Sequence, residues 1–145
     1  MRRSAGTVAA MSLDARTIDA RSITVAGLVV GATGIAVLWA SGVEFPVAVP
    51  PGIVILLAGA VFVALARWRW APAVGSFLGL FVTVGFAISP TGWDNLTGQH
   101  GASVAAGQAI QLAGVLTAVV AGIAATRAGY RQHPSPTPNG RAAHR

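Results

Sequence analysis

A stretch of 25 residues without a charged side chain, Ala102 to Thr126, limits most strongly what this chain can fold into. A helix rises about 1.5 Å per residue, and the hydrocarbon core of a bilayer is about 30 Å thick. The stretch is therefore long enough to cross a membrane as one helix. Three more apolar stretches precede it, at about 23–40, 52–70 and 73–89. The sequence predicts an all-α integral membrane bundle of four transmembrane helices that run up-down-up-down over residues 23–126.

The composition agrees with a membrane protein. The chain of 145 residues is 54% hydrophobic and only 10% charged, whereas soluble domains have about 25% charged residues. All ten basic residues are Arg, and the chain contains no Cys. The lack of Cys excludes disulfides, thiolate metal sites and Cys nucleophiles. The abundance of Ala, Gly, Val and Arg without Lys is typical of a bacterial protein from a GC-rich genome.

The arginines predict the orientation in the membrane. They fall before the first span, between the second and third, and after the fourth: Arg2, Arg3, Arg16 and Arg21; Arg67 and Arg69; Arg127, Arg131, Arg141 and Arg145. The two remaining loops contain no Arg and hold the acidic residues Glu44 and Asp94. Because basic loops stay in the cytoplasm, both termini are predicted to be cytoplasmic, in a multi-pass protein of the cell membrane. Because the arginine clusters lie between apolar stretches, they favour a lipid bilayer as the partner of this chain and argue against binding to nucleic acid.

The segments outside the spans are predicted to contain little folded structure. Residues 1–22 are polar and mixed in charge, so a short helix on the membrane surface and a solvated tail are equally favoured. The Gly, Pro, Asn and Asp residues of 90–101 predict a loop. Residues 127–145 become rich in Pro after His133, which predicts a disordered cytoplasmic tail.

Small residues recur four apart on the predicted spans, where they allow helix backbones to approach closely. The predicted helix-packing residues are Gly27, Gly31, Gly75, Gly79, Gly107, Gly114, Ala118 and Gly122. Aromatic and basic residues at the ends of spans are predicted to be interfacial anchors. These are Trp39, Arg67, Trp68, Arg69, Trp70 and Trp93. For the cluster at 67–70, binding of anionic lipid headgroups is the alternative to ordinary anchoring.

Two glutamines are the sharpest candidates for a functional role. Gln108 and Gln111 are the only amides in the apolar part of the chain, and Gln111 falls within the stripe of small residues on its helix. Together with Thr83 they are candidate polar residues, either forming hydrogen bonds between helices or lining a pore. Hydrogen bonding between helices is the favoured interpretation, because polar groups at helix interfaces commonly act in this way.

The sequence contains no constellation that indicates chemistry. The only ionisable side chains in the four predicted spans are Arg67 and Arg69, at the end of the second, and the apolar parts of the spans hold none, which argues against a proton-coupled pump. We expect no catalytic residue, no metal site and no cofactor, because no pair of nucleophile and base and no ligand spacing is present.

The leading hypothesis is therefore a non-catalytic accessory subunit or homo-oligomer, whose partner is itself or another membrane protein. The alternative is a passive transporter or channel for a small neutral solute, lined by the glutamines. An enzyme that acts on lipid through Asp94 or His100 is the least favoured class. The decision between the first two depends on whether Gln111 faces a helix or a cavity.

Overall fold

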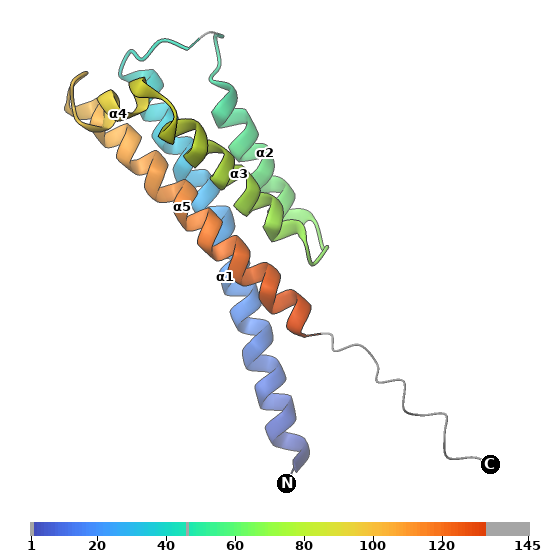
Figure 1. Cartoon of the computed structure of the whole chain (residues 1–145). Coiled ribbons are helices and arrows are strands. Elements are labelled where there is room, and N and C mark those ends of the chain that lie inside the picture. Colours follow the sequence, from blue (N-terminus) through green and yellow to red (C-terminus); the bar gives the residue numbers. More distant parts are fainter. Residues whose placement is uncertain (1, 46, 133–145) are drawn as a thin grey trace.

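The computed structural model describes residues 2–45 and 47–132. Within these residues it contains helices and no strand, which confirms the all-α prediction for this part of the chain. The helices are α1 (Arg2–Ala40), α2 (Pro51–Leu65), α3 (Ala71–Ala87), α4 (Pro90–Leu96) and α5 (Ala102–Arg131). The four longer helices lie side by side, and successive ones run in opposite directions (Figure 1).

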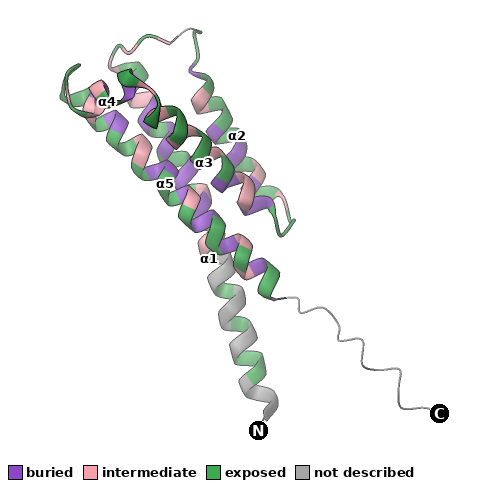
Figure 2. Cartoon of the chain, viewed as in Figure 1, coloured by how far each residue is buried: buried purple, intermediate pink, exposed green. Residues whose placement is uncertain are grey.

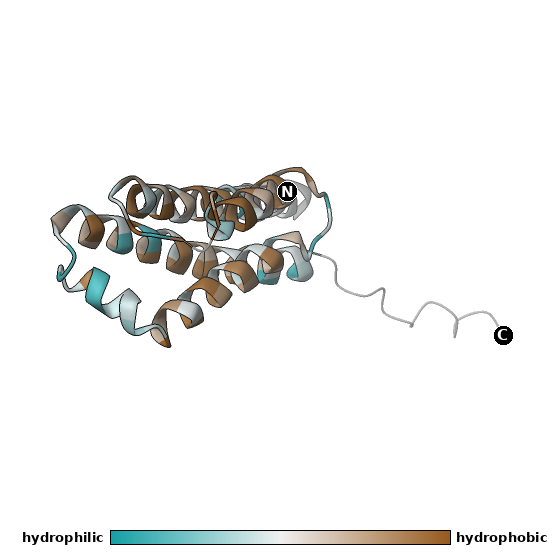
Figure 3. Ribbon diagram, turned by 90° about the horizontal axis from the view of Figure 1, so that it is seen from above, coloured by the Kyte–Doolittle hydropathy of each residue, from teal (hydrophilic) through white to brown (hydrophobic). Residues whose placement is uncertain are grey.

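Two helical segments are long and apolar enough to cross a membrane, Asp19–Ala40 of α1 and the whole of α5. A third is obtained if α3 and α4, which meet at 90°, are counted as one broken span. At 15 residues, α2 is apolar but measures only about 22 Å. Hydrophobic residues cover much of the longer helices when the molecule is seen from above (Figure 3). These lengths and this composition are those of a membrane protein.

The two ends of the molecule differ in character. One end carries α4 together with the 41–50 connection, and we call it the α4 end (Figure 1). The other end carries the turn at 66–70 between α2 and α3 and the C-terminus of α5, and we call it the arginine end. Trp39 and Trp93 lie at the α4 end, and residues 67–70 lie at the arginine end.

Helices α1 and α5 are in backbone contact. A Cβ atom built at Gly34 would overlap the backbone of Gln111, and one built at Gly114 would overlap the backbone of Gly31. A Cβ built at Gly27 would lie 2.7 Å from both Gly114 O and Ala118 N. The pairing leaves no room for any side chain at these glycines, so the two helices are held closer together than larger residues allow.

Helix α3 packs against the neighbouring face of α5. The buried Ser76 hydroxyl donates a hydrogen bond to Val119 O at 3.0 Å. A Cβ built at Gly79 would lie 2.6 Å from Val115 O, and one built at Gly122 would overlap Ser76. Each of the eight predicted packing residues is buried in the structure.

Helix α2 packs against α1 and α3 and, among the described residues, makes no close backbone approach to α5. Its buried face meets those helices in a core that includes Leu28, Leu56, Val63 and Val115, all fully buried. Buried residues line the facing sides of the helices, and exposed residues cover the outside (Figure 2).

The C-terminal end of α2 is completed by Arg21 of α1. The Arg21 guanidinium donates from Nε to Val63 O at 2.7 Å and from Nη2 to Ala66 O. The last carbonyl groups of a helix lack partners within the helix, and an apolar environment provides none. One arginine therefore satisfies two of these groups and links α1 to the start of the α2–α3 turn.

The prediction of a loop over residues 90–101 is wrong for its first half, which forms α4. Ser89 is the N-cap, and its hydroxyl oxygen accepts a hydrogen bond from Gly92 N at 3.2 Å. Pro90 follows in the first turn, where the fixed φ of proline suits a helix and its missing N–H is no loss. The local cap therefore outweighs a composition that is typical of loops.

Three further boundaries differ from the prediction. Helix α1 continues without a break from Arg2 through the predicted N-terminal segment, because residues 7–26 contain neither Gly nor Pro to stop it. Helix α2 ends at Leu65 instead of residue 70, where Ala66 becomes extended. Helix α5 continues past Thr126 to Arg131. The predicted disorder of the tail beyond residue 132 concerns residues outside the described part.

Candidate functional site

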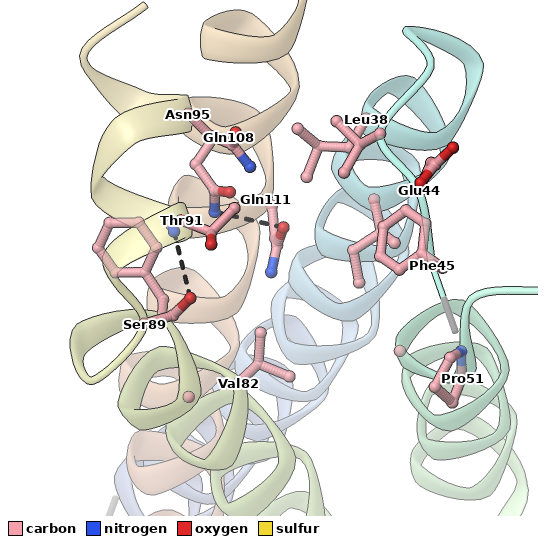
Figure 4. Close-up of a pocket in the computed structure, with 16 residues that line it drawn as sticks. Leu38, Glu44, Phe45, Pro51, Val82, Ser89, Thr91, Asn95, Gln108 and Gln111 are labelled. Atoms are coloured by element: carbon pink, nitrogen blue, oxygen red, sulfur yellow. Dashed lines mark hydrogen bonds between the residues drawn. The ribbon is translucent and has the colours of Figure 1, made fainter. Parts of the chain in front are cut away.

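A pocket of about 360 Å³ opens among the helices at the α4 end (Figure 4). All five helices contribute side chains to its wall, as does the connection that follows α1. The 90° bend between α3 and α4 lays α4 across this end instead of extending α3. The pocket lies within the range of about 300–1,000 Å³ that is typical of small-molecule sites.

Three carboxamides from two helices line this pocket, which we call the amide pocket. Gln108 and Gln111 project from α5, and Asn95 projects from α4 beside them (Figure 4). Gln108 is 4% exposed and Asn95 is 6% exposed. The Gln108 Nε2 group donates to Gln111 Oε1 across 3.4 Å, a long hydrogen bond that does not use the Gln111 amide nitrogen.

The Asn95 carboxamide makes no side-chain hydrogen bond to any described residue. No side-chain polar atom in the described ranges is both fully buried and unpaired, so the polar atoms of Asn95 border open space. Asn95 lines the amide pocket and also a second pocket beside it. A guest with a hydrogen-bond donor or acceptor could therefore pair with this carboxamide, because no described side chain does so.

Much of the remaining wall is apolar. It includes Ile35 and Leu38 of α1, Phe45 of the connection, and Val82 and Phe86 of α3. Phe86 is held by Trp93, whose ring centroid lies 4.9 Å away and whose indole N–H donates to Ala87 O at 3.2 Å. The site therefore offers hydrogen bonds on one side and hydrophobic contact on the other.

A second pocket of about 430 Å³ adjoins the first and shares Val43, Glu44, Thr91 and Asn95 with it. His100 is added to its lining. Glu44 is exposed, and no Arg lines either pocket. A carboxylate at the entrance and neutral amides inside suit a neutral molecule better than an anion.

The pocket is closed on the side that faces the arginine end. The next turns of α1, α2 and α5 contribute Leu28, Leu56 and Val115, which are fully buried in the core. Between the amides and the arginine end, the described helices are thus packed around apolar side chains. This arrangement differs from an open pore.

No protein-family model, no curated protein and no solved structure matches this chain. The site is therefore interpreted through the chemistry of its own residues.

The structure brings two of the three predicted polar candidates together. Gln108 and Gln111 line the amide pocket, whereas Thr83 does not and donates its hydroxyl to Gly79 O within α3 at 2.8 Å. The Gln111 side chain accepts a hydrogen bond from Gln108 of its own helix and lines the pocket, while its backbone packs against Gly34 of α1.

Sequence reasoning missed Asn95, Ser89 and Thr91, which also line the amide pocket. Thr91 and Asn95 lie in α4, within the predicted loop, and Ser89 is the N-cap of α4, at the end of the predicted third span. The combination of Ser89 and Pro90 was the available signal, because Ser at the N-cap followed by Pro marks the start of a helix. Asp94 lies outside both pockets and accepts a hydrogen bond from Gln99 Nε2 at 3.2 Å.

Proposed function

We propose that this chain is a four-span membrane protein of the cell membrane, with both termini in the cytoplasm. The distribution of Arg supports this orientation, because every Arg lies in the first half of α1, in the α2–α3 turn, or at the C-terminal end of α5 and in the sequence after it. In this orientation the α4 end faces outward. The amide pocket then opens to the outside of the cell.

The exposed apolar side chains support the two shorter spans. Large hydrophobic residues cover the outer faces of α2 and α3: Val54, Ile55, Leu57, Val61 and Leu65; Phe77, Leu80, Phe81, Val84 and Ile88. In water such a surface would promote aggregation, whereas in a bilayer it contacts lipid. A short apolar helix is accommodated in a membrane by local thinning and by the residues that flank it.

We further propose that the protein binds a small, neutral, partly apolar solute in the amide pocket and acts as its receptor or carrier. The observation that carries this proposal is the Asn95 carboxamide, buried beside two glutamines and without a protein hydrogen bond. Carboxamides both donate and accept hydrogen bonds, so they suit amides, alcohols and carbonyl compounds. Transport of the solute across the membrane would require the packed core between the amide pocket and the arginine end to open.

This proposal is preferred to association as accessory subunit or homo-oligomer. Association was motivated by the small-residue faces, and these residues are occupied by contacts within the chain. A partner using the same faces would have to replace those contacts. The pocket needs no such rearrangement to accept a guest.

Benzamide and benzoate provide a matched test of the ligand class, since they have the same ring and differ in charge. We expect benzamide to bind the purified full chain with a Kd of about 1 mM, as is typical of a small fragment. Benzoate is expected to bind at least about tenfold more weakly, because no cation compensates its charge. Saturation-transfer NMR in nanodiscs, with empty nanodiscs as control, measures both. Equal binding of the two compounds, or binding of neither, would contradict the proposal.

A further inference from the structure

A second, smaller pocket lies at the arginine end, between the α2–α3 turn and the last turns of α5. Its volume is about 130 Å³, and Arg21, Arg67 and Arg69 all contribute to its wall. We call it the arginine pocket. A water molecule occupies about 30 Å³ in the liquid, so the pocket offers the space of roughly four waters. This space accommodates a phosphate group and excludes a whole nucleotide.

The charges around the arginine pocket are uncompensated. No acidic residue lines it, and neither Arg67 nor Arg69 forms an ion pair or hydrogen bond with any described residue. The Arg69 guanidinium lies 5.7 Å from the ring centroid of Tyr130, a cation–π contact that leaves its N–H groups available. Arg21 is already engaged with two carbonyl oxygens, and it adds positive charge to the wall.

Aromatic rings beside the pocket indicate the depth at which it lies in a membrane. The indoles of Trp68 and Trp70 are stacked, with ring centroids 5.2 Å apart and planes inclined by 14°. Phe62 packs on both of them. Tryptophan concentrates at the level of the lipid headgroups. The arginine pocket is thereby placed at the depth of the lipid phosphates.

We propose that the arginine pocket binds the phosphate of an anionic phospholipid, and that the stacked indoles pack along the upper part of its acyl chains. Guanidinium groups form paired hydrogen bonds with phosphate oxygens, and basic pockets between membrane helices favour anionic lipids. The bound phosphate, with its single negative charge, offsets part of the positive charge of Arg67 and Arg69. This inference requires a membrane location and is independent of the amide pocket.

The test compares two pairs of substitutions that remove the same charge from the same end. Arg67→Gln with Arg69→Gln alters the pocket, whereas Arg127→Gln with Arg131→Gln removes exposed arginines that do not line it. The full chain in mild detergent is titrated with phosphatidylglycerol or phosphatidylcholine, and bound lipid is measured by native mass spectrometry. We expect Arg67→Gln with Arg69→Gln to lower the affinity for phosphatidylglycerol about tenfold or more. Arg127→Gln with Arg131→Gln is expected to lower it less than about threefold.

Far-UV circular dichroism verifies that both variants remain helical before the titration. An equal loss of affinity in the two pairs would overturn the proposal, because it would indicate attraction to the overall charge. If Arg67→Gln with Arg69→Gln kept the original preference for phosphatidylglycerol over phosphatidylcholine, the proposal would be overturned as well. A competition with inorganic phosphate distinguishes lipid from the free anion. If phosphatidylglycerol stays bound in millimolar phosphate, the ligand of the arginine pocket is the lipid. Release of phosphatidylglycerol by millimolar phosphate would contradict this assignment.

Discussion

Replacing Gly114 by leucine is expected to lower the free energy of unfolding by about 3 kcal/mol or more. A Cβ at this position already overlaps the backbone of Gly31 and lies 2.7 Å from Gly27 O. The obstructing atoms are backbone, so they cannot move aside as a flexible side chain can. Helices α1 and α5 must separate, which also disturbs the Gly34–Gln111 contact one turn away. Unfolding of the purified chain in mixed micelles with increasing sodium dodecyl sulfate measures the change.

The matched control is Gly85→Leu, a glycine-to-leucine change in helix α3. A Cβ built at Gly85 meets nothing within 4 Å, and the residue is exposed. We expect this variant to differ from the original chain by about 0.5 kcal/mol or less. If both substitutions destabilise the chain equally, or if neither does, close packing of α1 on α5 is not what holds the helices together.

The second large effect is expected at the amide pocket. Gln108→Leu keeps the size of the side chain and removes its amide, so the pocket loses both a donor and an acceptor. We expect the Kd for benzamide to rise at least about fivefold, since a hydrogen bond contributes about 0.5–1.5 kcal/mol and two are lost. Titration by saturation-transfer NMR gives the Kd for both proteins.

Thr83→Val serves as the control for this change. Thr83 lies on α3, its hydroxyl is bonded within its own helix, and it does not line the pocket. Its removal is expected to leave the Kd for benzamide within about twofold, because no lining hydrogen bond is lost. A similar loss in both variants would indicate a general disturbance of the helices, and an unchanged Kd in Gln108→Leu would remove Gln108 from the site.

The sequence predicted the longer helices because their signals are local and continuous. Apolar stretches bounded by Arg, Pro or Gly mark α2, α3 and α5 to within about five residues. Helix α4 escaped prediction because it is only seven residues long and rich in residues that favour loops. Its existence depends on one hydrogen bond of Ser89 and on the fixed φ of Pro90, details that composition conceals.

The site was predicted only in part for a related physical reason. Helical geometry identified Gln111 within the small-residue stripe, because residues of one helix have fixed angles to one another. Asn95 belongs to another helix, and its position beside Gln108 results from the 90° bend after α3. Relations between helices of this kind are set by tertiary packing, and no spacing within a single sequence encodes them directly.

The proposed opening of the amide pocket to the outside of the cell can be measured by cysteine labelling. The chain contains no Cys, so a single introduced cysteine is the only site for a maleimide. Thr91 is exposed and lines the pocket, and Arg131 is exposed at the opposite end. We expect Thr91→Cys to react with a membrane-impermeant maleimide in intact cells, and Arg131→Cys to react only after permeabilisation. The reverse pattern would contradict an outward-facing pocket.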